Sequence, residues 1–272
     1  MSNRIPIEGA TALVTGAGSG IGAATALALA ARGATVLCAD LDAASAEKAA
    51  AACEEAGAPR AAAHAVDVAD RAAMDDLAAR VHAEHGAVGI LVNNAGVGMS
   101  GRFTDMSAED WAWIRGVNLD GVVHGCAAFG PAMLDAGRGQ VVNLSSGLGY
   151  TPSSTEPAYV TTKAAVLALS RSLRADWAGH GVGVTAVCPG VINTPIIDHT
   201  RFLGDQADPK VRKRTTRLFR RGHKPELVAD AIVKAVERDR PVVPVGFEAW
   251  AGWWLHRYLP LRAQQAMARL RP

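Results

Sequence analysis

The chain has few cysteines, and their positions argue against the sites that cysteine most often builds. Only Cys38, Cys53, Cys126 and Cys188 occur among its 272 residues. No two of them form a C-x-x-C pair, so the sequence predicts neither a zinc site nor a disulfide framework. Scattered thiols are typical of a reducing compartment, and we expect a cytoplasmic protein.

Long hydrophobic runs are absent as well. No stretch reaches the ~18 apolar residues of a membrane-spanning helix, and residues 1–8 lack the apolar segment of a signal peptide. The formal net charge of +2 gives no reason to expect a nucleic-acid partner. The length fits a single domain with a full hydrophobic core.

Short apolar runs alternate with longer helical patterns along most of the chain. The expected strands are 10–14, 35–39, 62–66, 90–93, 141–144, 184–187 and 242–245. The expected helices are 21–32, 43–56, 70–85, 107–136, 158–178 and 225–238. Nearly continuous apolar strands are typical of a sheet buried on both faces. The sequence therefore predicts an α/β protein: a three-layer, doubly wound Rossmann fold with a seven-stranded parallel sheet.

A glycine-rich turn follows the first expected strand, with the sequence Thr15-Gly16-Ala17-Gly18-Ser19-Gly20-Ile21-Gly22. Glycines allow a tight turn there and let backbone N–H groups approach a pyrophosphate at the start of the next helix. A flexible turn is the alternative. The strand before it and the helix after it favour a dinucleotide site.

Asp40 ends the second expected strand. A carboxylate at this place accepts hydrogen bonds from the adenosine ribose and repels a 2′-phosphate. Neither Ser19 nor Leu41 is basic, so neither would neutralise that phosphate. The sequence favours NAD over NADP, with a solvated strand-end aspartate as the alternative.

Tyr159 and Lys163 are four residues apart and would lie on one face of a helix. A phenol titrates near ~10, but a neighbouring ammonium favours the phenolate and lowers its pKa. Ser146, thirteen residues upstream of Tyr159, could hold a substrate oxygen while the proton moves. A Y-x-x-x-K pair alone also fits an ordinary amphipathic helix, so its weight depends on the dinucleotide motif.

In chain order these motifs resemble the classical short-chain dehydrogenase/reductase family, from about residue 8 to residue 246. The T-G-x-x-x-G-I-G pattern matches residues 15–22, and the Y-x-x-x-K pair matches Tyr159 and Lys163. The further matching residues are Asp67, Val68, Asn93, Asn94, Ala95, Gly96, Asn118, Ser146, Pro189, Gly190 and Thr194.

The resemblance implies a catalytic tetrad of Asn118, Ser146, Tyr159 and Lys163. Tyr159 would be the general base in alcohol oxidation and the general acid in ketone reduction. Lys163 would hold the nicotinamide ribose and tune the tyrosine, and Ser146 would orient the substrate oxygen. Asn118 would anchor a water between Lys163 and solvent, or mark a kink in its helix.

The resemblance also implies direct hydride transfer, for which no metal is expected. The cofactor-binding residues that it implies are Gly16, Ser19, Gly20, Ile21, Gly22, Asp40, Asp67, Val68, Asn94, Ala95, Gly96, Tyr159, Lys163, Pro189, Gly190 and Thr194.

In this fold, ligands bind beyond the carboxyl ends of the strands. The segments 97–102 and 147–155 lie there and carry Val97, Met99, Leu148 and Tyr150 with few charges. We expect an apolar pocket for a bulky alcohol or ketone, with ordinary packing of these side chains as the alternative.

The long segment 191–224 is expected as the substrate lid, with His199 and His223 on its surface. It carries a basic run: Lys210, Arg212, Lys213, Arg214, Arg217, Arg220, Arg221 and Lys224. Such a run is usually a solvated helix face. An anionic substrate such as a CoA thioester, or an anionic membrane, could also meet it.

Residues 1–246 make up the expected catalytic domain, and residues 247–272 form an aromatic and basic C-terminal extension. The spacing of Trp250, Trp253 and Trp254 places them on one helical face. An aromatic face of this kind needs a cover. A neighbouring subunit or the protein's own core, the substrate pocket and a lipid interface are the alternatives.

We therefore expect an NAD-dependent short-chain alcohol dehydrogenase or ketoreductase, acting on a lipophilic secondary alcohol or ketone such as a steroid, terpenoid or long-chain alcohol. A 3-oxoacyl or 3-hydroxyacyl thioester reductase is the nearer alternative, and a membrane-associated NAD-binding regulatory protein is the non-enzymatic one.

The expected partners are a small, apolar substrate and further copies of the chain, with peripheral membrane contact through 247–272 left open. A homotetramer or homodimer would form through helices 107–136 and 158–178, whose small residues are Ala127, Ala128, Ala164, Ala165 and Ala168.

Overall fold

The computed structural model describes residues 5–260 and 262–264, which are built around one parallel sheet. Its strands run in the order β3-β2-β1-β4-β6-β7-β9, and every neighbouring pair is parallel. They are β1 (Thr11–Thr15), β2 (Thr35–Asp40), β3 (Ala61–Ala65), β4 (Ile90–Asn93), β6 (Gly139–Leu144), β7 (Val182–Pro189) and β9 (Val242–Val245). The predicted doubly wound, seven-stranded sheet is confirmed.

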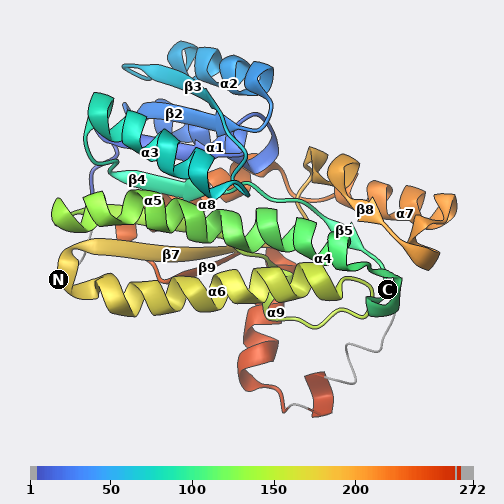
Figure 1. Cartoon of the computed structure of the whole chain (residues 1–272). Coiled ribbons are helices and arrows are strands. Elements are labelled where there is room, and N and C mark those ends of the chain that lie inside the picture. The colour runs from blue at the N-terminus through green and yellow to red at the C-terminus, as the bar shows by residue number, and fades with distance from the viewer. Residues whose placement is uncertain (1–4, 261, 265–272) are drawn as a thin grey trace.

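Helices cover both faces of this sheet (Figure 1). They are α1 (Gly20–Ala30), α2 (Ala43–Glu55), α3 (Arg71–His85), α4 (Ala108–Arg115), α5 (Gly121–Asp135), α6 (Pro157–Trp177) and α8 (Pro225–Arg238). Val14 and Val36 pack with α1, α2 and α8, whereas Leu13 and Leu37 pack with α3, α5 and α6. Successive strand residues thus face opposite layers, and each buried Val or Leu contributes roughly 1.5–3 kcal/mol.

The predicted helical stretch 107–136 is helical from Ala108 to Asp135, but it is not one regular α-helix. A π-helical turn, Gly116–Asp120, separates α4 from α5. Asn118 lies in this turn, and its amide accepts from the Val97 N–H at 2.8 Å and donates to the Val97 carbonyl at 2.9 Å. The wider turn aims a buried side chain at the loop after β4, as π-turns often do at functional sites.

The segment 191–224 contains elements that the sequence did not reveal. A short strand, β8 (Arg201–Phe202), pairs with β5 (Met99–Ser100), and α7 spans Pro209–Arg220. The Asp208 carboxylate accepts a hydrogen bond from the Lys210 N–H at 2.7 Å, which caps the start of α7. The predicted strand 184–187 is also too short, because the end of β7 pairs with β9 through Pro189 and Val245.

The chain continues after β9 into a helix, α9 (Phe247–Tyr258). Trp250 and Trp254 are 43% and 50% exposed, whereas Trp253 packs edge-on against Tyr150 with ring centroids 5.4 Å apart. For Trp253 the cover is the protein's own core, which is one of the expected covers, whereas Trp250 and Trp254 face solvent. Position 261 and positions 265–272 of the predicted extension lie outside the described residues.

None of the helices within 5–260 and 262–264 combines the length and the apolarity that crossing a membrane requires.

Candidate active site

A cavity of about 1850 Å³ lies at the carboxyl ends of the strands. Asp40 at the end of β2, Leu144 at the end of β6 and Pro189 at the end of β7 all line it. Its walls extend from the glycine-rich turn to α9, so one space joins the predicted dinucleotide residues to the predicted catalytic ones.

The glycine-rich turn is shaped by backbone contacts that a side chain would block. Gly16 has a φ of +63°, a conformation that favours glycine. A Cβ on Gly22 would overlap the Gly16 carbonyl oxygen, so the turn and the first helical residues can pack only without one. Ser19 precedes α1, and Ser19, Gly20 and Ile21 line the cavity where the N-terminal N–H groups of this helix gather.

The Asp40 carboxylate holds the loops on both sides of it. One oxygen accepts a hydrogen bond from the Gly18 N–H at 2.8 Å, and the other accepts from the Asp42 N–H at 3.1 Å. These contacts fix the carboxylate at the cavity wall beside the glycine turn. It is placed to receive ribose hydroxyls there.

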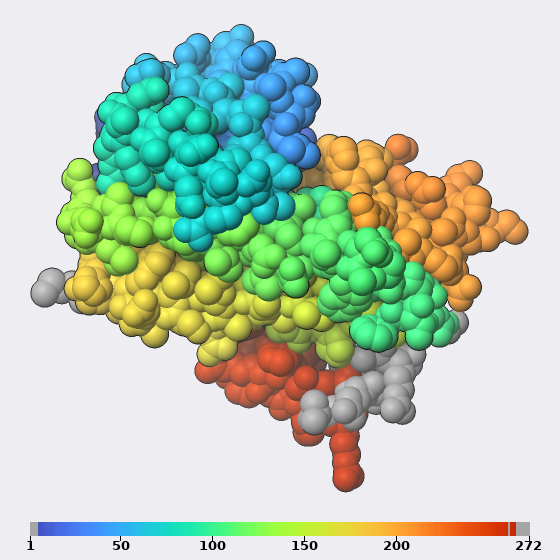
Figure 2. Space-filling view, in the orientation of Figure 1, coloured from blue at the N-terminus to red at the C-terminus, as the bar shows by residue number. Residues whose placement is uncertain are grey.

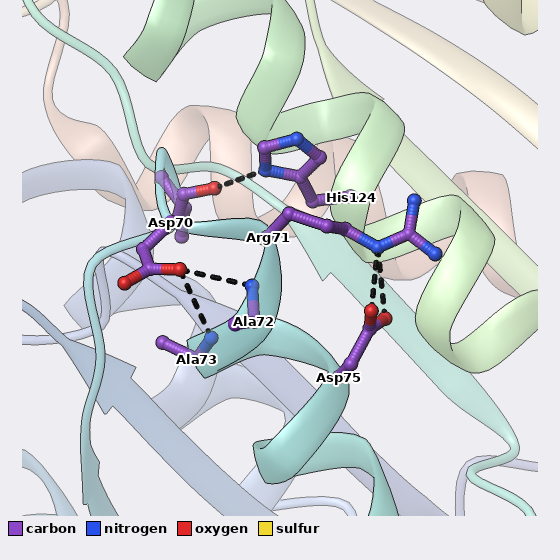
Figure 3. A network of polar contacts seen from close by, with 7 residues as sticks. Asp70, Arg71, Ala72, Ala73, Asp75 and His124 are labelled. Atoms are coloured by element: carbon purple, nitrogen blue, oxygen red, sulfur yellow. Dashed lines mark hydrogen bonds and ion pairs between the residues drawn. The ribbon is translucent and has the colours of Figure 1, made fainter.

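A polar network holds the loop that carries Asp67 and Val68, both of which line the cavity. Figure 3 shows Asp70 accepting from the N–H groups of Ala72 and Ala73 at the start of α3, at 2.9 and 3.2 Å. His124 of α5 lies in the same network, with Nδ1 2.8 Å from the Val68 carbonyl oxygen. The loop is thereby tied to both neighbouring helices.

The N-N-A-G segment joins the end of β4 to the glycine-rich turn. The Thr15 hydroxyl accepts from the N–H groups of Asn94 and Ala95 at 3.0 and 3.1 Å. The Asn94 amide donates to the carbonyl oxygens of Thr15 and Gly16, at 2.9 and 3.2 Å. Gly96 follows beside Asn118 and Lys163, whose Nζ would lie 3.4 Å from a Cβ at this glycine.

Ser146, from the loop after β6, and Tyr159 and Lys163, from α6, all line the cavity. Ser146 lies beside Tyr159 and favours its phenolate, and the Lys163 ammonium is 5.8 Å from the tyrosine ring centroid. Lys163 also donates to the Leu144 carbonyl oxygen at 2.9 Å and is 4% exposed. The hydroxyl of the neighbouring Ser145 donates to the Lys163 carbonyl oxygen at 2.7 Å.

Burial dominates the protonation of the pair. It raises the pKa of Tyr159 to about 12, with the Ser146 hydrogen bond opposing and the Glu156 carboxylate adding to the rise. It lowers the pKa of Lys163 to about 8. The expectation that Lys163 lowers the tyrosine pKa is therefore not met in this structure, because desolvation of the phenolate has the largest effect on this pKa.

The segment from Pro189 to Thr194 borders the same cavity. The Gly190 N–H donates to the Val245 carbonyl oxygen at 2.8 Å. Thr194 lies against the glycine-rich turn, 3.1 Å from the position of a Cβ on Gly20. The loop therefore closes over the turn that the sequence assigns to the pyrophosphate.

Sequence reasoning missed Glu248, which lies on α9 and lines the cavity. Its carboxylate accepts from the Val191 N–H at 2.6 Å and lies 3.2 Å from Nε2 of His223. His223 is exposed, as expected, and it also contacts this carboxylate. Nothing local in the sequence signals this contact, because Glu248 is 57 residues from Val191.

The four predicted substrate-pocket residues, Val97, Met99, Leu148 and Tyr150, all line the cavity. Two of them also pack tightly: Met99 is 1% exposed and Tyr150 is 5% exposed. The Tyr150 hydroxyl donates to the Ala249 carbonyl oxygen at 2.5 Å. This residue holds α9 in place and does not offer a free hydroxyl to a ligand.

Further cavity residues come from segments whose folding the sequence did not reveal. They are Phe202, Leu218 and Phe219 of the lid and Phe247, Leu255 and Leu259 of the C-terminal extension. Glu156 also lines the cavity, and burial raises the pKa of its carboxyl group. The i, i+3 spacing of Glu156 and Tyr159 was a readable signal for this neighbour.

These residues fit a dinucleotide. The glycine-rich turn leaves a cradle that a Cβ would fill, the start of α1 supplies backbone N–H donors, and Asp40 supplies a fixed acceptor. Beyond the cradle, the Ser146, Tyr159 and Lys163 group lies under an apolar space. The arrangement can hold a substrate oxygen and exchange a proton with it.

Comparison with known proteins identifies related chains. The family model described as short chain dehydrogenase matches residues 10–201. The "Probable oxidoreductase EphD" of Mycobacterium tuberculosis is 44% identical over 264 residues, which are 95% of this chain but 44% of that protein. The chain thus spans less than half the length of that relative.

The matches to two further proteins cover a larger share of those proteins. The D-threitol dehydrogenase of Mycolicibacterium smegmatis is 40% identical over 204 residues, 74% of this chain and 77% of that protein. A short chain dehydrogenase/reductase from Burkholderia phymatum, solved in complex with NAD, superposes with a TM-score of 0.85 at 31% identity and covers 98% of both chains.

Proposed function

The chain belongs to the short-chain dehydrogenase/reductase family, and on that premise we propose an NAD-dependent oxidoreductase that interconverts a lipophilic secondary alcohol and its ketone. One observation carries the proposal. Ser146, Tyr159 and Lys163 meet in a cavity that the glycine-rich turn bounds at one end and apolar side chains of the lid and α9 bound at the other.

The tetrad residues have distinct tasks in this proposal. Ser146 holds the substrate oxygen by a hydrogen bond, and Tyr159 takes the hydroxyl proton in oxidation or returns it in reduction. Lys163 stabilises the phenolate by its charge and binds the nicotinamide ribose. Asn118 fixes the Val97 backbone beside this group and anchors a water that connects Lys163 to solvent. NAD, when bound, supplies the hydride acceptor.

The carboxylate of Asp40 supports NAD over NADP. It lies at the end of β2 with both oxygens already hydrogen-bonded to backbone N–H groups, so it is held in place as an acceptor for ribose hydroxyls. Its charge would repel a 2′-phosphate. Asp42, which also lines this part of the cavity, adds a second negative charge.

The apolar lining supports a bulky, lipophilic substrate. Ile196, Phe202, Leu218, Phe219, Phe247 and Leu255 surround the space beyond Tyr159. The D-threitol relative carries a polyol in its name, which makes a small polyol the competing substrate class. The α7 residues that line the cavity are Thr215, Leu218 and Phe219, so its basic side chains do not favour a thioester inside the cavity.

The same proposal covers the organisation of the chain. Residues 1–246 form the catalytic domain with the lid at 191–224, and residues 247–272 form a C-terminal extension, of which α9 closes one wall of the cavity. We place the protein in the cytoplasm as a homodimer or homotetramer, with peripheral membrane contact through the extension.

A substrate panel tests this function. Purified protein is assayed for reduced-cofactor formation with NAD and with NADP, using bulky apolar secondary alcohols, small polyols and a 3-hydroxyacyl thioester. The proposal expects the highest kcat/KM with NAD and a bulky apolar alcohol. Preferential turnover of the polyols or the thioester would overturn the substrate class, and NADP preference would overturn the cofactor.

A further inference from the structure

Helix α7 carries opposite chemistry on its two sides. Val211, Thr215, Leu218 and Phe219 follow an i, i+4, i+7, i+8 spacing, and the last three line the cavity. The basic face of α7 consists of Lys210, Lys213, Arg214, Arg217 and Arg220, all of which are exposed. Within the described part of the chain, none of these five forms an ion pair.

Helix α9 also presents two sides. The aromatic face of α9 consists of Phe247, Trp250, Trp254 and Tyr258, which are 83%, 43%, 50% and 66% exposed. Trp254 and Tyr258 stack with ring centroids 5.3 Å apart. The opposite side is anchored to the body through Ala249, which is 2% exposed, and through Trp253. The helix is therefore held firmly while its largest rings face solvent.

The two helices border one cavity. Leu218 and Phe219 of α7 and Phe247 and Leu255 of α9 all line it. Figure 2 shows the segment around α7 (orange) and the segment around α9 (red) as two lobes that project from the body, with the region around residues 100–110 (green) between them. Phe103, which is 67% exposed, belongs to that intervening region.

We propose that the basic face of α7 and the aromatic face of α9 together dock this protein on an anionic phospholipid bilayer, with the cavity between the two helices turned toward the lipid. The proposal rests on the lipophilic substrate proposed above in one respect: such a substrate partitions into the bilayer. Docking would shorten its route to Tyr159.

The chemistry of the two faces selects this partner. Clustered Lys and Arg side chains are attracted to anionic headgroups, and Trp and Tyr rings favour the membrane interface. A nucleic acid would pair with the basic face but leave the aromatic face in water. A second copy of this chain carries the same cations, which would repel one another across a shared basic face.

Vesicle flotation with the full chain tests the proposal. Phosphatidylcholine vesicles with and without phosphatidylglycerol are compared at low and high salt. We expect binding only when phosphatidylglycerol is present, and weaker binding at high salt. Each basic residue near such a surface raises the membrane-binding constant about fivefold. The double substitution Lys213→Glu and Arg217→Glu should therefore reduce that constant by more than about 20-fold.

A matched control separates docking from a general charge effect. Lys234 and Arg238 are also exposed, four residues apart and at the end of a helix, but they lie on α8. Lys234→Glu with Arg238→Glu changes the net charge by the same amount and should leave flotation within about twofold of the wild type. Equal losses in the two variants would overturn the proposal.

Substitutions on α9 test the second arm. Trp254→Ala with Tyr258→Ala should weaken flotation at low and at high salt alike, because it removes apolar contact and no charge. Unchanged flotation of this variant would remove α9 from the docking surface and overturn the two-helix proposal. Failure of the wild type to bind phosphatidylglycerol vesicles, with binding to duplex DNA or self-association in its place, would also overturn it.

Turnover of a water-soluble secondary alcohol without vesicles is measured in every variant. The Lys213→Glu, Arg217→Glu protein should retain it, since neither residue lines the cavity. If the wild type shows no turnover, the proposed function is contradicted. The docking proposal is then tested by the flotation results alone.

Discussion

The carboxylate of Glu248 accepts a hydrogen bond from the backbone N–H of Val191 at 2.6 Å. The same carboxylate lies 3.2 Å from His223, whose own N–H donates to the Val191 carbonyl oxygen at 2.9 Å. A residue from α9 and a residue before α8 thus hold the loop that follows Pro189 and Gly190. In the proposed function this loop contacts the nicotinamide, so α9 positions part of the cofactor site.

Removing this acceptor should weaken cofactor binding. Glu248→Ala leaves the Val191 N–H without its charged partner, and bonds of this kind contribute about 1.5–3 kcal/mol. We expect KM for NAD to rise about tenfold or more, measured by steady-state kinetics. Glu248→Gln retains an acceptor oxygen and should recover most of the affinity.

Glu226→Ala on α8 is the control, because Glu226 is exposed and does not line the cavity. An equal rise in KM for the Glu226 and Glu248 variants, or no rise in either, would contradict the positioning role.

Asp40 should set the choice between NAD and NADP. Asp40→Ala removes the charge that repels a 2′-phosphate and also removes the acceptor for the Gly18 N–H. The ratio of kcat/KM for NAD to that for NADP should fall by about tenfold or more. Asp40→Asn keeps an acceptor without the charge, so an unchanged ratio in both variants would show that the aspartate does not select the cofactor.

The buried ammonium of Lys163 should lower the free energy of unfolding at neutral pH. Burial lowers its pKa from 10.5 to about 8, so the folded protein binds this proton less readily than the unfolded chain. The resulting loss of folding stability is full below pH 8, and it disappears as the pH rises toward 10.5. Lys163→Met should therefore raise the melting temperature by about 2–4 °C or more at pH 7.

This gain should shrink as the pH rises above 8. Thermal unfolding of the two proteins at a series of pH values measures it, and a gain that is absent at pH 7 or grows with pH would refute the sign.

The oxidation rate should rise with pH. In the proposed function the base is the phenolate of Tyr159, and burial raises the pKa of this residue to about 12. Below that value the phenolate fraction increases tenfold with each pH unit. The logarithm of kcat/KM should rise with a slope of about +1 and flatten above pH 8, where Lys163 begins to lose its charge. A flat profile would exclude Tyr159 as the titrating base.

The sheet could be predicted because its strands carry their burial in their own sequences. Leu13 and Val14 face opposite helical layers, so both are apolar, and the neighbouring strands β2 and β4 repeat this pattern. The π-turn around Asn118 could not be predicted in this way. It depends on two hydrogen bonds to Val97, 21 residues away, which no local propensity encodes.

In the candidate site, too, local motifs could be predicted and contacts between distant segments could not. Motifs with fixed spacing, such as Tyr159 and Lys163, named residues that the structure brings into one cavity. The order of their pKa values was not readable, because the sequence shows a neighbouring charge but not the burial that outweighs it. Tyr150 was assigned to the pocket by its place in the chain, and only the structure shows that its hydroxyl holds α9.

The most direct test of the proposed chemistry compares the wild type with Tyr159→Phe in the oxidation of a bulky apolar secondary alcohol with NAD. We expect kcat to fall by about 10²–10⁴, while NAD binding, measured by calorimetry, stays within about twofold. Tyr258→Phe, on the exposed face of α9, should leave kcat unchanged. Turnover that survives in Tyr159→Phe would contradict the assignment of this tyrosine as the proton-transfer group.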